Sequence, residues 1–308
     1  NRDMGDHTMK QPSIDILIPT YKPGPEFAML LRRLACQRYP ARQVIIINTE
    51  EQYWDPALEA EYPGCRVEHI RREEFDHGGT RRRMAAMSQA DLFLCMTQDA
   101  LPADEDLIGN LVKAFENPLV KAAYARQLPR EDCSLAEQFT RSFNYPPESR
   151  IKTRADLKTL GIKTFFCSDV CAAYDRKTYC ELGGFPEQAG FNEDMIYASK
   201  VIRAGYAVAY TAEAQVIHSH NYTGRQQFHR NFDLGVSQAD HPEIFAKYPS
   251  EGEGIRLVKQ TAGFLMRKRK PWLLVPLFWQ SACKYAGYWL GKRYRKLPGW
   301  VRRRCGIK

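Results

Sequence analysis

Short apolar runs alternate along the chain with longer stretches of mixed polarity. Residues 14–18, 44–47 and 92–96 have the length and composition of buried strands, and residues 67–70 form a weaker run of the same kind. Each run ends in polar or turn-forming residues. The pattern therefore predicts four strands in the first third of the chain.

Between these runs, apolar side chains return at helical spacing. Phe27, Leu30, Leu31 and Leu34 form a single stripe, so a helix is expected from about residue 25. Residues 104–115 repeat this pattern, and residues 81–89 are expected to form a helix opened by a glycine pair. Strands that alternate with amphipathic helices predict an α/β fold, with a mostly parallel sheet covered by helices on both faces.

The ends of the predicted strands carry polar side chains. Thr20, Glu50 and Asp99 each follow a run, and ligands of parallel sheets bind outside the carboxyl ends of the strands. One cleft could therefore gather all three. Farther along, residues 129–163 form a polar stretch that could be an acceptor-side insertion. The expected organisation is a tail or expression remnant at 1–12, a catalytic domain at 13–222 and a helical region at 223–308.

The charge of the chain is concentrated near its C-terminal end. Fifteen of the 45 Lys and Arg follow Glu253, and no Asp or Glu does. The apolar segment 271–279 within this region is shorter than the roughly 20 residues that span a bilayer. Trp, Phe and Leu flanked by bases are typical of a segment that lies in a membrane interface. A buried packing helix with a solvated basic face and a true span are the alternatives.

Cysteine usage and missing motifs exclude several classes of protein. The nine cysteines are odd in number and scattered, and no C-x-x-C pair occurs, which argues against a zinc site and a secreted disulfide framework. A reducing cytosol fits best. There is no P-loop and no G-x-G-x-x-G, which argues against an ATPase and a dehydrogenase.

Two separate residues suggest a metal site. Asp99 follows a buried strand, where a carboxylate can ligate Mg²⁺ or Mn²⁺ together with diphosphate oxygens, and His218 ends the later apolar run 214–217. Each residue also has an ordinary structural explanation. Asp99 could cap the turn before Pro102, and His218 could be a hydrogen-bonded structural histidine.

The segment His77-Gly78-Gly79-Thr80-Arg81 could cradle a phosphate. Two glycines before a helix let backbone N–H groups approach an anion, and the helix N-terminus adds partial positive charge. Arg81 would add a full charge. The alternative is a glycine-rich turn before a surface helix.

A third cluster is Asn192-Glu193-Asp194. Asn192 is a good N-cap, and the two acids suit the first turn of a helix that runs to Ala204. A carboxylate near a helix N-terminus is expected to stay ionised at neutral pH, ready to take a proton from an acceptor hydroxyl. Capping alone would also explain both acids. The loop with Gly184 and Phe185 would lie beside the cluster.

Taken in order, these motifs resemble the inverting glycosyltransferases of family 2, which have the GT-A fold. The resemblance spans roughly residues 13–222. It rests on Ile18-Pro19-Thr20-Tyr21, Glu50, Gln98-Asp99, Leu182-Gly183-Gly184-Phe185 and Asn192-Glu193-Asp194. Within the family, residues 75–81 and 227–235 look like those of bacterial rhamnosyltransferases.

The resemblance implies a role for each matching position. Asp194 would be the catalytic base, and Asp99 with His218 would hold a divalent cation, Mg²⁺ or Mn²⁺. The family's D-x-D is here Thr97-Gln98-Asp99, so its first acid is missing. The donor-binding residues would be Thr20, Tyr21, Glu50, His77, Gly78, Thr80, Arg81, Gln98 and Asp99. The acceptor-side residues would be Gly184, Phe185, Asn192 and Glu193.

The implied activity is transfer of a sugar, L-rhamnose from dTDP-β-L-rhamnose, to a glycan or polyprenyl-linked glycan in cell-surface polysaccharide synthesis. The protein would act at the cytoplasmic face of the membrane, held there by its basic region. The alternatives are a UDP-hexose donor, a transferase-like scaffold, or a non-catalytic protein whose basic aromatic tail binds RNA. Nucleic acid is not expected, because that alternative leaves the acidic clusters unexplained.

Overall fold

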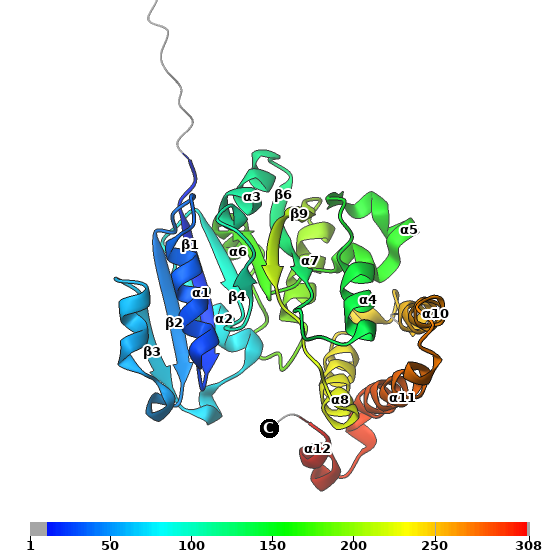
Figure 1. The fold of residues 1–308 in the computed structure, drawn as a ribbon. Coiled ribbons are helices and arrows are strands. Elements are labelled where there is room, and N and C mark those ends of the chain that lie inside the picture. The colour runs from blue at the N-terminus through cyan, green and yellow to red at the C-terminus, as the bar shows by residue number, and fades with distance from the viewer. Residues whose placement is uncertain (1–10, 250, 307–308) are drawn as a thin grey trace, which may run out of the picture.

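The computed structural model describes residues 11–249 and 251–306. The tail expected at residues 1–12 therefore falls almost wholly outside the described residues. Within them, one nine-stranded sheet runs through the molecule and carries helices on both faces (Figure 1). The predicted α/β class is confirmed.

The first half of the sheet is parallel, with the strand order β3-β2-β1-β4. Its strands are the four that the apolar runs predict: β1 (Ile14–Tyr21), β2 (Gln43–Thr49), β3 (Arg66–Ile70) and β4 (Leu92–Met96). β3 is the edge strand and the most exposed, which explains its weaker pattern. The four carboxyl ends point to the same edge of the sheet.

The second half of the sheet is mixed, which corrects the expectation of a mostly parallel sheet. β8 (Cys171–Asp175) is antiparallel to both β4 and β6 (Val120–Leu128), and β6 is parallel to β9 (Ala207–Ile217). Two short strands, β5 (Leu101–Pro102) and β7 (Arg150–Lys152), pair antiparallel with β9. The reversal of β8 puts the loop before it at the same edge as the end of β4. The sequence of β8, CAAYD, contains no β-branched residue, so its composition did not predict a strand.

Four helices enclose two apolar layers, one on each face of the sheet. They are α1 (Pro25–Ala35) and α3 (Leu107–Lys113) on one face, and α2 (His77–Met87) and α7 (Glu193–Arg203) on the other. Ile16 and Ile18 face the first layer while Leu17 faces the second, because successive side chains of a strand alternate. The stripe predicted for α1 is buried.

Two helix boundaries differ from the sequence prediction. α2 begins at His77, before the glycine pair, because the Asp76 carboxylate accepts a hydrogen bond from the Gly79 N–H at 2.7 Å and caps the helix there. α3 is shorter than residues 104–115 and continues as a 3₁₀ turn to Glu116. The polar stretch 129–163 contains α4 (Leu135–Asn144) and α5 (Leu157–Leu160), and α6 (Arg176–Glu181) follows β8.

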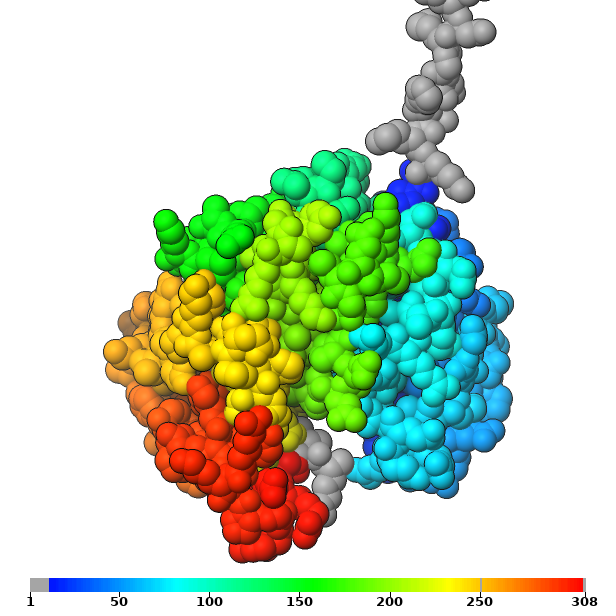
Figure 2. Space-filling model, turned by 180° about the vertical axis from the view of Figure 1, so that it is seen from behind, coloured from blue at the N-terminus to red at the C-terminus, as the bar shows by residue number. Residues whose placement is uncertain are grey.

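The C-terminal region is helical, as expected. Its helices are α8 (Gly224–Asp240), α9 (Pro242–Phe245), α10 (Glu251–Arg267), α11 (Leu274–Gly291) and α12 (Gly299–Cys305). They gather on one side of the molecule, seen from yellow to red in Figure 2. Among the described residues, no helix combines the length and apolarity needed to cross a bilayer.

Glycines bring α8 and α11 into backbone contact. A Cβ added to Gly287 would collide with the carbonyl oxygen of Phe228, and one added to Gly291 would collide with that of Phe232. Interaxial distance depends on the side chains at the contact, so glycines there allow the closest approach. α11 is therefore held tightly on α8, which in turn flanks the candidate site.

Candidate active site

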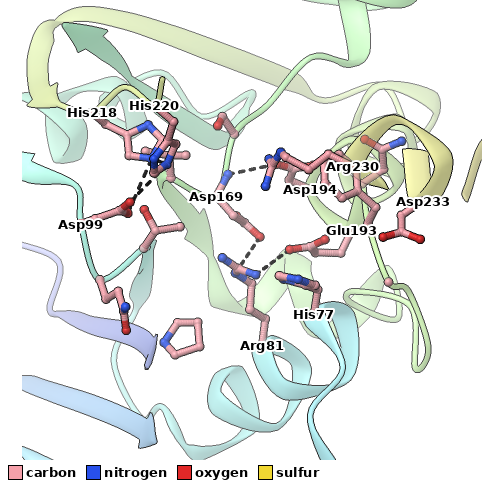
Figure 3. A pocket seen from close by; sticks show the side chains of 18 of the residues that line it. His77, Arg81, Asp99, Asp169, Glu193, Asp194, His218, His220, Arg230 and Asp233 are labelled. Carbon is pink, nitrogen blue, oxygen red and sulfur yellow. Dashed lines mark hydrogen bonds and ion pairs between the residues drawn. The ribbon is translucent and has the colours of Figure 1, made fainter. Parts of the chain in front are cut away.

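One hollow of about 890 Å³ opens at the edge of the sheet where β1 and β4 end. We call it the transfer hollow. Thr20, Gln98, Asp99, Asp194 and His218 all line it. In Figure 3, Asp99 and the histidines lie on one side and Asp194 on the other. The structure thus brings together residues that are far apart in the sequence.

Asp99, His218 and His220 form a cluster on one wall of the transfer hollow. The Asp99 carboxylate lies 3.5 Å from His218 Nε2 and 3.2 Å from His220 Nε2, and the two Nε2 atoms are 3.0 Å apart. The pairing of Leu101 with Ile217 between β5 and β9 draws the two segments together. All three donor atoms therefore converge on one point.

The hydrogen bond made by Nδ1 of His218 determines which tautomer this ring adopts. Its Nδ1 lies 3.0 Å from Oε1 of the buried Gln127, which can only accept, so Nδ1 carries the proton and Nε2 presents its lone pair to the cluster. Burial lowers the pKa of His218 to about 3, so the ring is neutral at neutral pH. Burial alone would raise the pKa of Asp99, but the hydrogen bond from His220 holds that pKa below its ordinary value.

The donor set of this cluster fits a divalent cation. Asp99 offers an ionised carboxylate, and His218 offers the lone pair of its Nε2. His220 adds a second imidazole nitrogen, 3.0 Å from His218 Nε2. All the ligand atoms lie within 4.8 Å of one another. A site that combines carboxylate and imidazole ligands suits Mn²⁺ or Zn²⁺ better than Mg²⁺, which prefers oxygen ligands alone. These residues could therefore hold a metal ion.

A second cluster, of three carboxylates and one arginine, also lines the transfer hollow. Arg81 is buried and pairs with Glu193 at 2.7 Å and with Asp169 at 3.3 Å. Burial works against its charge, but the two carboxylates hold the pKa of Arg81 above its ordinary value. Burial also raises the pKa of Asp169, whose carboxyl accepts from the Tyr174 hydroxyl at 2.6 Å.

Asp194 belongs to this cluster and is the carboxyl best placed for proton transfer. It follows the first residue of α7, and its oxygens accept from the Asp169 N–H at 3.0 Å and the Met195 N–H at 2.7 Å. Burial, with the neighbouring Glu193 carboxylate, raises the pKa of Asp194 to about 7. The expectation that this group is simply ionised is therefore wrong, because burial outweighs the helix terminus. A carboxyl with a pKa near 7 suits a general base.

Asn192 precedes α7 but does not cap it with its side chain. Its backbone is left-handed, with φ 66°, and its side chain makes no capping hydrogen bond. The prediction that the Asn192 side chain caps the helix is therefore wrong, although α7 does begin directly after this residue. Asn192 is buried and lines the transfer hollow, and its Nδ2 has no hydrogen-bond partner among the described residues. That donor is available to a ligand.

Aromatic and basic side chains surround Tyr21, which lines the transfer hollow. The Tyr21 and Tyr53 rings are 5.7 Å apart in an edge-to-face arrangement, and the Arg72 guanidinium lies 5.7 Å from the Tyr21 ring. Thr20 is buried and donates to Asn48. Glu50 does not line the hollow. Its carboxylate instead accepts from the Arg72 N–H at 2.6 Å and positions that residue.

The phosphate cradle predicted at His77 to Arg81 is not available. The Gly78 N–H donates to the carbonyl of Ala189 and the Gly79 N–H to Asp76, so the helix N-terminus is already satisfied. Gly78 and Thr80 do not line the transfer hollow, and Arg81, which does, is already paired with two carboxylates. His77 also lines the hollow, and burial lowers its pKa.

The predicted acceptor-side loop is also corrected. Phe185 lies in the apolar core and Gly184 packs against the Tyr179 ring, so neither lines the transfer hollow. The carbonyls of Gly183 and Phe185 accept from Arg82, which fastens this loop to α2. Glu193 lines the hollow, but Arg81 occupies its carboxylate.

Sequence reasoning missed several residues of the site. His220 stands two positions after His218, and two imidazoles at strand spacing could have been recognised. Asp169 and Gln127 carried no such signal, because they reach the transfer hollow only through the reversal of β8 and the placement of β6. Arg230 lies within the segment 227–235 that carried the resemblance, but no role in the site was predicted for it.

Comparison with known proteins now bears on this geometry. The model of the family described as "Glycosyl transferase family 2" matches residues 15–183, more than half of the chain. The chain belongs to glycosyltransferase family 2. Within that family it is 41% identical over 287 residues to the O-antigen chain rhamnosyltransferase RfbN of Salmonella typhimurium, covering 92% of this chain and 91% of that protein. It is 38% identical over 290 residues to WbaN of Salmonella anatum, which has the same description, covering 93% and 91%.

Solved structures support the fold of this family 2 glycosyltransferase. The mannosyltransferase PcManGT from Pyrobaculum calidifontis, in complex with GDP-Man and Mn²⁺, superposes with a TM-score of 0.60 at 16% identity, covering 91% of this chain and 88% of that chain. S. aureus TarS 1–349 gives 0.51 at 13% identity, covering 92% and 91%. The expected GT-A type of fold, with a C-terminal helical extension, is confirmed.

Proposed function

We propose that this glycosyltransferase transfers L-rhamnose from dTDP-β-L-rhamnose to a hydroxyl of a lipid-linked glycan, with inversion at the anomeric carbon. The observation that carries the proposal is that Asp194 and the cluster of Asp99, His218 and His220 line one hollow. The choice of sugar is supported by two rhamnosyltransferases that are 41% and 38% identical over most of their length.

Asp194 is the proposed general base. Its carboxylate removes the proton of the acceptor hydroxyl while the hydroxyl oxygen bonds to the anomeric carbon. The bond from that carbon to the diphosphate oxygen breaks at the same time, and dTDP departs with the electron pair. Because desolvation and the neighbouring Glu193 carboxylate raise the pKa of Asp194, it holds a proton more readily than an ordinary carboxylate does.

The other wall of the transfer hollow binds the donor. Asp99, His218 and His220 would hold a divalent cation, Mn²⁺ or Mg²⁺, and a bound cation supplies positive charge to the diphosphate. Tyr21 would offer its ring to the base, with the Arg72 guanidinium beside it and Tyr53 packed against Tyr21. This placement keeps the leaving diphosphate on the side of the hollow away from Asp194.

The donor screen is the experiment that tests this function. The purified chain is incubated with dTDP-β-L-rhamnose, UDP-glucose or GDP-mannose, with Mn²⁺ or with EDTA, and nucleotide release is measured. We expect dTDP release that requires the metal, and little UDP or GDP release. Faster turnover of UDP-glucose than of dTDP-rhamnose contradicts the proposed donor. The Asp194→Asn variant is the negative control for chemistry.

We also propose that the C-terminal region docks on the inner face of the cell membrane. Trp272, Phe278 and Trp279 are more than half exposed, and a run of four bases, 267–270, precedes them. An aromatic surface beside clustered bases is typical of an interface with anionic lipid.

Vesicle flotation tests the docking proposal. Phosphatidylglycerol vesicles are expected to bind the full chain, and the double variant Trp272→Ala/Phe278→Ala is expected to bind them more weakly. Leu119→Ala/Ile151→Ala removes two exposed apolar side chains from the body and serves as the matched control. Equal binding by both double variants and the wild type removes the C-terminal region as the anchor.

A further inference from the structure

A second hollow, of about 530 Å³, lies between α8 and α12. We call it the basic hollow. Its lining is rich in cationic side chains and consists of Tyr222, Arg225, Gln226, His229, Arg230, Arg303, Arg304 and Gly306. None of the described residues that line it is acidic. Neither the catalytic base nor the donor wall uses this hollow.

The basic hollow contains four guanidinium groups. Among the described residues, no carboxylate lies within ion-pair distance of Arg225, Arg230, Arg303 or Arg304. Arg225, Arg303 and Arg304 are exposed, whereas Arg230 is half-buried. Clustered like charges raise the local positive potential, and guanidinium groups bind phosphate oxygens through paired hydrogen bonds. The hollow is therefore suited to a phosphate or diphosphate group.

The basic hollow adjoins the transfer hollow. Tyr222 and Arg230 line both. The Arg230 guanidinium lies 4.7 Å from the Tyr222 ring, and that ring lies 4.8 Å from the ring of His220 in the metal cluster. Tyr222 and Arg230 therefore lie where the two hollows meet. A glycan whose anionic end sits in the basic hollow can extend its sugars over the pair toward Asp194.

The basic hollow also adjoins an exposed aromatic surface. Trp279 of α11 packs against Gly224, the first residue of α8, where its Nε1 would lie 2.8 Å from an added Cβ. Trp279 is 66% exposed, and Trp300 of α12 is 63% exposed. Trp300 stands three and four positions before Arg303 and Arg304, so all three share one face of α12. Apolar rings thus border the arginine side chains of the basic hollow.

We propose that the basic hollow binds the phosphate or diphosphate ester that links the acceptor glycan to its lipid, and this inference rests on the proposed function. The guanidinium groups hold the anion, the aromatic border receives the lipid, and the sugars pass over Tyr222 and Arg230 to the transfer hollow. The chain would thereby select an acceptor by its lipid-linked end, apart from its sugars.

Direct binding by the full chain tests the proposal. Farnesyl diphosphate, farnesol and inorganic pyrophosphate are titrated calorimetrically in EDTA. We expect farnesyl diphosphate to bind more tightly than the other two. The double variant Arg303→Gln/Arg304→Gln should weaken that binding about tenfold or more, since a charge-assisted hydrogen bond contributes at least that factor. Lys296→Gln/Arg302→Gln removes the same charge from neighbouring exposed positions outside the hollow and should leave the binding unchanged.

Several outcomes overturn the proposal. Equal weakening by the two double variants means that general surface charge is responsible, and no weakening means that the hollow is not the site. Pyrophosphate binding as tight as that of farnesyl diphosphate assigns the hollow to a free anion. If Arg303→Gln/Arg304→Gln weakens only flotation on phosphatidylglycerol vesicles, the ligand is a phospholipid headgroup. Failure of the wild type to turn over dTDP-rhamnose overturns the proposed function but leaves these binding results readable.

Discussion

The side-chain amide of Gln98 makes two hydrogen bonds to the backbone of Tyr21. Its oxygen accepts from the Tyr21 N–H at 2.9 Å, and its Nε2 donates to the Tyr21 carbonyl at 3.1 Å. This pair joins the turn after β4 to the end of β1, where the strands no longer pair. Gln98 therefore holds Tyr21 in place in the lining of the transfer hollow.

Gln98→Glu is expected to lower the free energy of unfolding by about 1 kcal/mol, because a carboxylate cannot donate to the Tyr21 carbonyl. Urea denaturation at pH 7 measures the change. Gln52→Glu, at an exposed position, makes the same chemical change and should stay within about 0.5 kcal/mol of the wild type. Equal stability of the two variants would mean that the pair to Tyr21 is not stabilising.

Asp194→Asn is expected to lower kcat by about 10²–10⁴-fold, the usual contribution of a general base, with donor affinity preserved. The amide oxygen can still accept from the Asp169 N–H, so the local structure should survive. Steady-state kinetics and donor titration separate the two effects. Glu187→Gln, on the exposed loop before α7, should behave as the wild type. Normal turnover by Asp194→Asn would remove Asp194 as the base.

The pH profile of kcat/KM is expected to fall below about pH 7, because the pKa of Asp194 is raised to about 7 and its protonated form cannot act as a base. Rates between pH 5 and 9 define this limb. An ordinary, solvated carboxylate would place it near pH 4.

Stability gives an independent measure of the same pKa. The folded state binds the Asp194 proton more tightly than the unfolded state, so this group favours folding most at low pH and less as pH rises through its folded pKa of about 7. Asp194→Asn lacks this titration. Its free energy of unfolding relative to wild type should therefore rise from pH 5 to pH 8. A constant difference would argue against the raised pKa.

His220→Ala is expected to weaken Mn²⁺ binding at least about tenfold. Removing a group that only hydrogen-bonds to a metal ligand already costs about that much, and loss of a ligand should cost no less. Calorimetry with MnCl₂ alone measures this without turnover. His69→Ala, on β3 outside the transfer hollow, is the matched control. Unchanged Mn²⁺ affinity in His220→Ala would exclude this imidazole as a ligand.

Gly287→Ala is expected to destabilise the fold by about 1–3 kcal/mol, because the new methyl group would strike the carbonyl of Phe228 and push α11 off α8. Gly254→Ala, where an added Cβ meets nothing within 4 Å in α10, should instead stabilise by up to about 1 kcal/mol. Thermal unfolding of both variants provides the comparison. A stable Gly287→Ala protein would show that α8 and α11 tolerate separation.

Local pattern was sufficient for the parallel half of the sheet. The apolar run before Asp99 and the stripe of α1 depend on residues that are neighbours in sequence, and both are found as predicted. Pattern was insufficient for β8, whose small residues are buried by its neighbours on both sides. The same holds for Phe185, because burial in the core depends on what packs against it.

The order of residues along the chain predicted which groups could do chemistry: the carboxylates of Asp99 after β4 and of Asp194 at the start of α7, and the imidazole of His218 after β9. These follow from strand ends and helix starts, which short-range forces set. Only the tertiary structure decided their states. Desolvation and the neighbouring Glu193 carboxylate raise the pKa of Asp194. The N–H groups of Gly78 and Gly79 already donate to Ala189 and Asp76, so they are not available to a phosphate. Desolvation and hydrogen-bond competition depend on which distant groups come together, and no local stretch of sequence contains that information.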